Sequence, residues 1–425
     1  MTPLPRSLLP DTASTDKSGR LSIGGVDVLD LVGQVGTPVF IYDEEHLRRR
    51  CREAVVAWGD GVAYASKAFL CKAMAAVAGE EGMYIDVSTG GETFVSLQAG
   101  VPAWRLVLHG SNKSEDELRS ALAAGVGRIV IDSFDEISRL ERLAPELGVR
   151  PAVLVRVTPG VEAHTHEYVM TGQEDSKFGF GFASGAAAEA VARLHRPESP
   201  VALVGIHAHI GSQVFAAESF TKAVQVLAPF VIPLGLPELC LGGGLGVPYV
   251  EGETAPTITE WARTLKQACA QAGIPPTTRI TAEPGRAIVA SAAITCYRVG
   301  TIKPLPNLRT YVSVDGGMSD NPRPVLYGSG YEAFLPRSVN APRPQVVNVV
   351  GKHCESGDVL VRDARVPADL VVGDVLATPV TGAYGHSMAS NYNKVRRPPV
   401  VFVRDGRARV VVRRETYDDL LHLEA

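Results

Sequence analysis

The sequence predicts an α/β protein in which a (β/α)8, TIM-like barrel is joined to a second, mostly β domain. Two observations predict this fold class. From about residue 43 to 291, short apolar runs alternate with amphipathic stretches at helical spacing. After about residue 291, helical spacing gives way to short strands separated by turns. A succession of eight βα units over roughly 240 residues fits the size of a closed parallel barrel.

The N-terminal 42 residues are expected to form short β segments that could join the second domain. A charged helix start follows at Asp43-Glu44-Glu45. The expected segments are Leu21 to Ile23, Val26 to Val28 and Pro38 to Tyr42.

Eight runs are predicted as barrel strands, and capping residues open several of the helices between them. An open doubly wound sheet is the alternative, but no Gly-x-Gly-x-x-Gly follows the first strand. The strands are Val62 to Ala65, Tyr84 to Val87, Leu106 to His109, Arg128 to Ile131, Ala152 to Val157, Leu203 to His207, Glu238 to Leu241 and Arg279 to Ala282. The helices include Ser114 to Ala124, Phe134 to Leu147, Ala186 to His195, Ser219 to Phe230 and Ile258 to Ala272.

The C-terminal third is expected to contain seven strands and one late helix, Thr416 to Leu423. The domain boundaries we expect are therefore 43–291 for the barrel and 1–42 with 292–425 for the β-rich domain. The seven strands are Ala293 to Lys303, Thr310 to Val314, Pro344 to Val350, Val359 to Arg362, Val375 to Thr378, Val400 to Arg404 and Arg407 to Arg414.

Composition favours small-molecule chemistry. The 425 residues carry a net charge of −4, and the basic residues are scattered, so we expect neither a nucleic-acid partner nor membrane association. The N-terminus does not resemble a secretory signal, and no apolar run is long enough to span a bilayer. Six widely separated cysteines without metal-binding spacing favour a reducing cytoplasm. Five of them are expected to pack in apolar surroundings.

Chemistry-bearing residues follow the predicted strands, where barrels place their active sites. Lys67 lies in the run Val62 to Phe69, just after a short strand; for this run alone, a solvated strand-end lysine is the safer interpretation. The triple glycine Gly242 to Gly246 suits a phosphate group, and Glu283 could hold a proton on a ring nitrogen. His209 could lie against a flat ring, although a single histidine is more often a packing residue. Together these residues describe a site for pyridoxal 5'-phosphate.

Seven ordered motifs resemble those of the diaminopimelate decarboxylases, members of the alanine-racemase-like (fold type III) class of pyridoxal phosphate enzymes. The resemblance runs from about residue 20 to the C-terminus, and the family's barrel plus β domain agrees with the periodicity. The motifs are Tyr64-Ala-Ser-Lys-Ala, His207-x-His-Ile-Gly-Ser-Gln, Gly242-Gly-Gly-Leu-Gly, Glu283-Pro-Gly-Arg, Val314-Asp-Gly-Gly-Met, Arg323-Pro-x-Leu-Tyr327 and Gly351-Lys-His-Cys-Glu-Ser-Gly-Asp358.

The resemblance implies a role for each matching residue toward the cofactor. Lys67 would form the covalent bond to the cofactor, and His209 would stack on its ring. Glu283 would pair with the pyridine nitrogen. The remaining cofactor contacts would be Asp86, Ser212, Gly244, Gly285, Arg286 and Tyr384.

The resemblance also implies the substrate contacts and a homodimer. Cys354 matches the family's proton donor, which reaches the site from the second subunit, so the active sites would lie at a dimer interface. Glu355 would meet the distal ammonium of the substrate. Its carboxylates would be bound by Arg286, Arg323 and Tyr327, with Tyr384 nearby.

Physical chemistry is consistent with these roles. A glutamate at position 283 keeps the pyridinium protonated and the ring a strong electron sink, which favours decarboxylation over the racemisation of relatives with arginine there. A thiol with a pKa of about 8.5 can return a proton near neutral pH. Cys354 could instead be a buried packing residue, but its neighbours His353 and Glu355 are polar.

The arginine-rich substrate set favours meso-2,6-diaminopimelate, giving L-lysine and CO2, the last step of lysine biosynthesis. Decarboxylation of ornithine, arginine, carboxynorspermidine or a specialised amino acid stays open, as does a silent cofactor-binding relative. Gly385-His386 departs from the family pattern. The loop Glu162 to Gly179 is either surface chain or a lid, and the spacing of its acidic and histidine residues does not specify zinc: His164, His166, Glu167 and Asp175.

Overall fold

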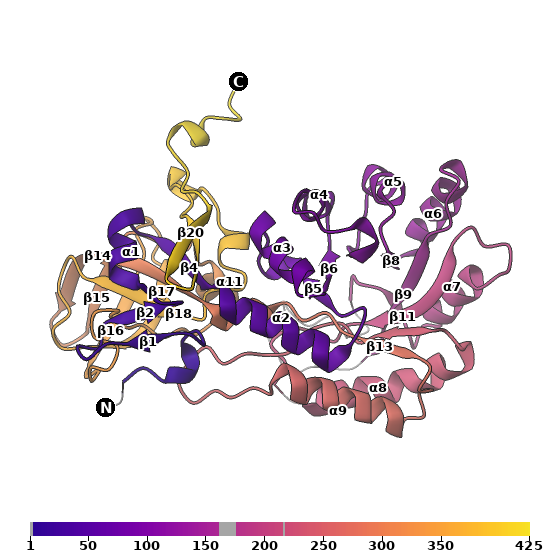
Figure 1. Ribbon diagram of the computed structural model, residues 1–425, viewed down its shortest axis with the longest axis horizontal. Helices are drawn as coiled ribbons and strands as arrows, with labels where there is room; N and C mark the ends of the chain where they lie inside the picture. The colour runs from indigo at the N-terminus through magenta and orange to yellow at the C-terminus, as the bar shows by residue number, and fades with distance from the viewer. Residues whose placement is uncertain (1–2, 161–175, 216) are drawn as a thin grey trace. The chain divides into compact units, whose positions relative to one another are not determined.

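The computed structural model describes residues 3–160, 176–215 and 217–425, and the chain divides into two compact units. The barrel unit comprises Arg50–Gly246 and Ala255–Ala287, and the β unit comprises Met1–Arg49, Val247–Thr254 and Ile288–Ala425. Figure 1 labels the helices and strands of both units.

The barrel unit is built on parallel strands in the order β13-β12-β11-β9-β8-β7-β6-β5. Hydrogen bonds from Ala63 N to Ala282 O (3.0 Å) and from Ala65 N to Pro284 O (3.2 Å) join the two ends of this sheet, which closes the ring. The predicted barrel and all eight predicted strands are confirmed. The strands are β5 (Ala63–Ala65), β6 (Tyr84–Val87), β7 (Leu106–Leu108), β8 (Arg128–Ile131), β9 (Ala152–Thr158), β11 (Ala202–Ala208), β12 (Glu238–Cys240) and β13 (Arg279–Thr281), with β10 (Phe180–Gly181) paired to β9.

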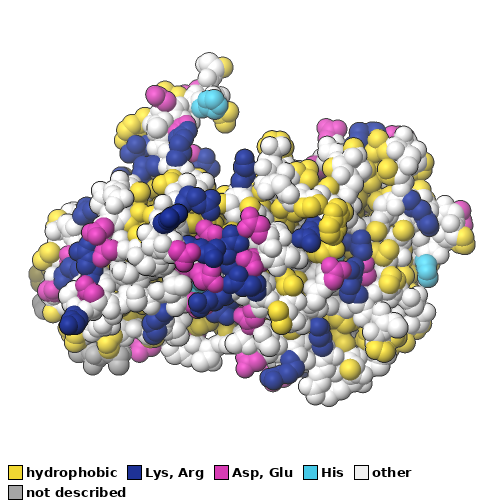
Figure 2. All heavy atoms as spheres, viewed as in Figure 1, with side chains coloured by type: hydrophobic (Ala, Val, Ile, Leu, Met, Phe, Trp, Pro, Cys, Tyr) yellow, Lys and Arg dark blue, Asp and Glu magenta, His cyan; other side chains and the backbone are white. Residues whose placement is uncertain are grey.

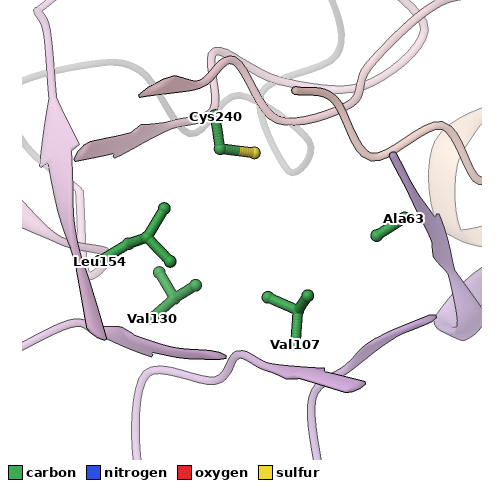
Figure 3. Packing of buried hydrophobic residues seen from close by; sticks show 5 residues of the cluster. All are labelled: Ala63, Val107, Val130, Leu154 and Cys240. Atoms are coloured by element: carbon green, nitrogen blue, oxygen red, sulfur yellow. The ribbon is translucent and has the colours of Figure 1, made fainter. Parts of the chain in front are cut away.

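Small apolar side chains fill the barrel interior, as Figure 3 shows. Each comes from a different strand and points into the enclosed space, so the barrel is a packed core rather than a channel. The residues drawn are Ala63, Val107, Val130, Leu154 and Cys240. Near the amino ends of the strands, buried Glu238 pairs with Arg128 and Arg279. The polar residues that follow the strands lie at the opposite, carboxyl ends.

Amphipathic helices surround the strands in Figure 1. Capping boxes at Ser114 and Thr257 start two of them, because each hydroxyl accepts a backbone N–H that the first turn leaves without a helical partner. The five predicted helices are confirmed to within two residues. The helices are α2 (Glu44–Trp58), α3 (Lys72–Glu80), α4 (Gly90–Gln98), α5 (Glu115–Ala124), α6 (Phe134–Glu146), α7 (Ala186–Leu194), α8 (Ala217–Val231) and α9 (Ile258–Gln271).

The β unit contains an eight-stranded sheet in the order β17-β16-β15-β14-β4-β19-β20, with β18 beside β14. The N-terminal strand β4 pairs antiparallel with β14 and parallel with β19, so the early β segment does join the C-terminal third. A small sheet holds β1 (Ser14–Thr15), β2 (Leu21–Ile23) and β3 (Val26–Asp27). The large sheet holds β4 (Val39–Asp43), β14 (Ala293–Leu305), β15 (Arg309–Val314), β16 (Gln345–Val350), β17 (Val359–Val366), β18 (Val375–Pro379), β19 (Val400–Arg404) and β20 (Arg407–Val412).

Two local predictions were wrong. Val28 does not end a strand but starts helix α1 (Val28–Val35), whose N-cap Asp27 accepts a hydrogen bond from Asp30 N. The predicted helix Thr416 to Leu423 is only a 3-10 turn, Asp418–Leu420. Leu421 and Leu423 are 57% and 94% exposed, so this segment buries no apolar face that would stabilise a longer helix.

Charges of both signs mix on the face shown in Figure 2. Near the start of α2, Arg48 and Arg49 pair with Glu44 and Glu45 one helical turn away. Opposite charges therefore neutralise one another locally on this face. Among residues 3–160, 176–215 and 217–425, none of the helices combines the length and the apolar character that crossing a bilayer requires.

Candidate active site

Lys67 lies at the carboxyl end of the first barrel strand. It sits in the 3-10 turn Ser66–Ala68 after β5, and its side chain is half exposed. The buried Tyr64 hydroxyl donates to Phe69 O (2.6 Å), which bridges the turn and fixes the backbone that carries the lysine. Lys67 Nζ lies 3.9 Å from Oδ2 of the buried Asp86 on β6. An amine is thus presented at the barrel mouth beside a carboxylate.

Glu283 follows β13 and is buried at the same mouth. His109 Nε2, just after β7, lies 2.8 Å from its Oε1, and His207 Nε2, on β11, lies 3.0 Å from its Oε2. Burial by itself would raise the pKa of Glu283, but the two histidines outweigh it and hold that pKa well below its usual value. The site therefore contains a buried, ionised carboxylate.

His209 is half-buried one residue beyond β11 and is held by the glycine turn. Gly243 N donates to His209 Nδ1 (3.1 Å), so this nitrogen carries no proton. Burial, followed by the nearby Lys67 and Arg156 cations, holds the pKa of His209 well below its usual value. The ring is thus neutral, which suits a flat stacking surface.

The glycine turn after β12 leaves no room for side chains. Gly244 adopts a φ of +109°, and a Cβ there would overlap the Gly211 carbonyl oxygen. Val214 N donates to Gly244 O (2.9 Å) and Gly246 N to Val214 O (3.0 Å), which ties the loops after β11 and β12 together. A close-packed glycine backbone of this kind leaves space for an anion to approach the main chain.

Three further predicted residues complete this end of the barrel. Arg286 Nη2 donates to Ser212 Oγ (2.9 Å), so a guanidinium and a hydroxyl meet beside the glycine turn. Gly285 packs on the Lys67 strand, because a Cβ there would lie 2.9 Å from both Ala65 Cβ and Ala65 O. Eight predicted residues are thus in one barrel mouth: Lys67, Asp86, His209, Ser212, Gly244, Glu283, Gly285 and Arg286.

This mouth fits a flat, phosphorylated aldehyde cofactor. It offers an amine for an aldehyde, a neutral imidazole for an aromatic face, an ionised carboxylate for a ring nitrogen and a glycine turn for a phosphate. Asp86 Oδ1 is also buried without a hydrogen-bond partner among the described residues, as expected of a group placed for a ligand.

Apart from Arg286, the predicted substrate residues lie in the β unit. Arg323 starts helix α11 (Arg323–Tyr327) and is buried, with its guanidinium 4.3 Å over the Tyr249 ring and Nη1 donating to the Tyr331 hydroxyl (2.8 Å). Tyr327, at the end of that helix, is half-buried. Tyr384 is half-buried in the left-handed region at φ 56°, which marks a constrained position.

Cys354 and Glu355 are exposed on a turn of the β unit. Their neighbour His353 fixes this turn, because its ring nitrogens lie 2.9 Å from Ser319 Oγ and 2.9 Å from Asn393 Oδ1. Glu355 accepts a hydrogen bond from the Tyr392 hydroxyl. The thiol is thus accessible and rigidly carried. Of the other cysteines, Cys51, Cys240, Cys269 and Cys296 are buried and Cys71 is half-buried.

The segment Gly385-His386, which departs from the family pattern, has a packing role. His386 meets Phe40 edge to face at 5.8 Å, and a Cβ on Gly385 would lie 3.1 Å from the same ring. Most of the loop Glu162 to Gly179 lies outside the described residues, and so do His164, His166, Glu167 and Asp175.

His109 and His207 were missing from the predicted site set, although both belong to motifs at predicted strand ends. The signal was available, since Lys67, Asp86 and Glu283 were recognised from the same position in their own βα units. The sequence does not show that these two side chains, which are far apart in the chain, lie close enough to contact the same carboxylate.

A protein-family model identifies the class of enzyme to which the barrel belongs. The family model described as "Pyridoxal-dependent decarboxylase, pyridoxal binding domain" matches residues 44–290, which cover the whole barrel. Together with the amine, carboxylate and glycine turn of the barrel mouth, this match defines a pyridoxal-dependent decarboxylase.

Full-length relatives narrow the family. The chain is 47% identical over 98% of its length to the diaminopimelate decarboxylase of Mycobacterium tuberculosis, covering 97% of that protein. It is 44% identical to that of Bacillus subtilis, with 98% of each chain covered. The crystal structure of the M. jannaschii diaminopimelate decarboxylase in complex with L-lysine superposes with a TM-score of 0.90 at 31% identity, covering 98% of each chain. The chain belongs to the diaminopimelate decarboxylase family.

Proposed function

We propose that this protein decarboxylates meso-2,6-diaminopimelate to L-lysine and CO2, the last step of lysine biosynthesis, with pyridoxal 5'-phosphate as cofactor. One observation supports the proposal: a chain related over its full length to diaminopimelate decarboxylases has Lys67 and an ionised Glu283 together at its barrel mouth. A glutamate rather than an arginine opposite the ring nitrogen favours decarboxylation over racemisation.

In this proposal the barrel holds the cofactor. Lys67 would hold the cofactor through its aldehyde carbon, His209 would face the ring, and Glu283 would keep the proton on the ring nitrogen. The glycine turn would hold the phosphate. The phosphate contacts would be Ser212, Gly244, Gly285 and Arg286, with Asp86 and Tyr384 completing the cofactor site.

When bound, the cofactor supplies a conjugated ring that accepts the electron pair left as the Cα–carboxylate bond breaks. The protein residues orient the substrate for this step. Arg286, Arg323 and Tyr327 bind carboxylate, and Glu355 binds the distal ammonium. After CO2 leaves, the Cys354 thiol gives its proton to Cα, so one carboxylate is replaced by one hydrogen.

We further propose a cytoplasmic homodimer whose active sites are shared between subunits. Cys354 and Glu355 are exposed on the β unit, which suits their reaching the barrel of a second copy. In functional terms the domains are 43–291, which holds the cofactor, and 1–42 with 292–425, which contributes to the dimer and to the substrate site.

To test this proposal, purified, cofactor-loaded protein is incubated separately with meso-diaminopimelate, LL-diaminopimelate, ornithine, lysine and arginine. CO2 release and product identity are measured for each substrate. We expect L-lysine from the meso isomer alone. Release of CO2 from ornithine or arginine in preference to the meso isomer would overturn the substrate. Turnover of none of them by a protein that binds the cofactor would point to another amino acid.

A further inference from the structure

Two histidines that have no role in the proposed chemistry meet the carboxylate on which it depends. His109 directly follows β7 and His207 lies on β11, and these two strands are separated in the barrel by β8 and β9. Each ring nitrogen Nε2 lies on a different oxygen of Glu283, at 2.8 Å and 3.0 Å. Their rings cross at 67° with centroids 4.9 Å apart. The carboxylate is thereby fixed in position and in rotation.

The surroundings of His207 define where its proton lies. Its Nδ1 is buried and has no hydrogen-bond partner among the described residues. A proton on Nδ1 would be a buried, unpaired donor, whereas a proton on Nε2 is donated to Glu283. Burial lowers the pKa of His207, in keeping with a neutral ring. Glu283 thus accepts a hydrogen bond from Nε2 of this ring.

The turn that carries His109 is also rigid. The buried Lys113 ammonium donates to Gly110 O (2.8 Å) and Val130 O (2.7 Å) and pairs with Glu136 (2.7 Å). Because these contacts span the chain from Gly110 to strand β8 and helix α6, the loop after β7 cannot move without breaking a buried ion pair. His109 Nε2 therefore stays at Glu283, with Asp86 Oδ1 at 3.8 Å.

We propose that His109 and His207 are positioning residues that hold Glu283, through one N–H each, in the orientation and ionised state in which it pairs with the cofactor's ring nitrogen. The inference rests on the proposed function, since it assigns Glu283 to that nitrogen. Both oxygens of a carboxylate have two lone pairs, so each imidazole leaves an acceptor position open for the ring N–H. Without the histidines, burial would favour the protonated form of Glu283, which does not supply a carboxylate to pair with the ring N–H of the cofactor.

A divalent metal is the competing occupant of these three residues. The two Nε2 atoms and a carboxylate oxygen all lie within 4.8 Å of one another. However, the 2.8 Å and 3.0 Å separations are those of direct hydrogen bonds, and Glu283 already uses both oxygens. The other charged or titratable groups that act on these residues or lie beside them are Lys67, Asp86, Arg156, His209 and Cys240.

The first measurement uses cofactor-free protein with ¹⁵N-labelled histidine. Side-chain ¹⁵N NMR should report His207 as the neutral Nε2–H form from about pH 6 to about pH 8. A His207 that carries its proton on Nδ1, or that becomes a cation within this range, would overturn the proposal. So would a stoichiometric zinc ion that survives EDTA and disappears in His207→Leu.

The second measurement compares cofactor dissociation constants of His207→Leu, His207→Gln and wild type, with exposed His422→Leu as the control. Leucine removes the donor, so affinity at neutral pH should fall about tenfold or more. The ratio to wild type should shrink as pH rises and Glu283 ionises again. Glutamine places its own N–H near the Nε2 position and should restore affinity to within about threefold.

A ratio that does not change with pH, or a glutamine variant as weak as leucine, would mean that His207 only fills space. If the wild type turns over diaminopimelate and His207→Leu binds cofactor normally, the positioning role fails and the proposed function stands. If the wild type binds no cofactor, the proposed function fails, and the NMR measurement still decides the hydrogen bonds. His109→Leu and His109→Gln should repeat the pattern.

Discussion

Replacing Gly244 with alanine should weaken cofactor binding through the backbone alone. The new Cβ would overlap the Gly211 carbonyl oxygen, so one of the two loops must shift. A shift breaks the Val214–Gly244 and Gly246–Val214 hydrogen bonds, at about 1 kcal/mol each. Alanine at φ +109° adds about 1 kcal/mol of backbone strain. Roughly 3 kcal/mol in total corresponds to about a hundredfold loss of affinity if it falls on the bound state.

The assay is titration of cofactor-free protein with pyridoxal 5'-phosphate, followed by absorbance, with melting temperature measured in parallel. Gly100→Ala is the matched control, because Gly100 has a φ of +86° and a Cβ there meets nothing within 4 Å. The control should bind the cofactor within about twofold of wild type. A Gly244→Ala protein that melts early but binds normally would refute the phosphate role, since the glycine would then serve the fold alone.

We make three further predictions, which concern the shared active site, the buried Asp320 and the buried Glu238. Mixing inactive Lys67→Ala and Cys354→Ala chains should restore activity in hybrid dimers, measured as lysine formation, because one site in each hybrid keeps both residues; absence of recovery would argue against shared sites. Burial raises the pKa of Asp320 from 3.8 to about 7, so the folded protein keeps this proton after the unfolded chain has lost it, and stability should fall as pH rises through that window. Asp320→Asn should remove this loss, up to about 4 kcal/mol above pH 7 by urea unfolding, whereas exposed Asp405→Asn should not. Glu238→Gln should lower the free energy of unfolding by about 2 kcal/mol in the same assay. This loss is smaller than for a fully buried ion pair, because the Arg128 and Arg279 side chains remain 26% and 30% exposed. The surface variant Glu146→Gln should lower it by less than about 1 kcal/mol.

The fold was predictable because each barrel element carries its own local signal. Short apolar runs, capping residues and helical spacing set the strands and helices to within a residue or two, and eight repeats leave few architectures to choose from. The errors fall where local pattern and burial disagree. Thr416 to Leu423 has helical spacing but no surface to cover, and Val28 continues a β-like run although Asp27 caps a helix.

The candidate site was partly predictable for a similar reason. Lys67 and Glu283 follow their strands and Asp86 lies near the carboxyl end of β6, and a closed parallel barrel brings all these strand ends to one mouth. His109 and His207 also lie at predicted strand ends, but their convergence on Glu283 was missed, because it depends on side-chain reach across the ring rather than on spacing along the chain. Cys354 was recognised by resemblance, and its exposure is a property of the tertiary structure.

The most direct test of the account asks where the cofactor is held. Cofactor-loaded protein is reduced with borohydride, digested, and mapped by mass spectrometry. We expect one added cofactor mass, on the peptide that contains Lys67, and its loss in Lys67→Ala. A label on a different lysine, or none in protein that binds the cofactor, would contradict the claim that this barrel mouth is the active site.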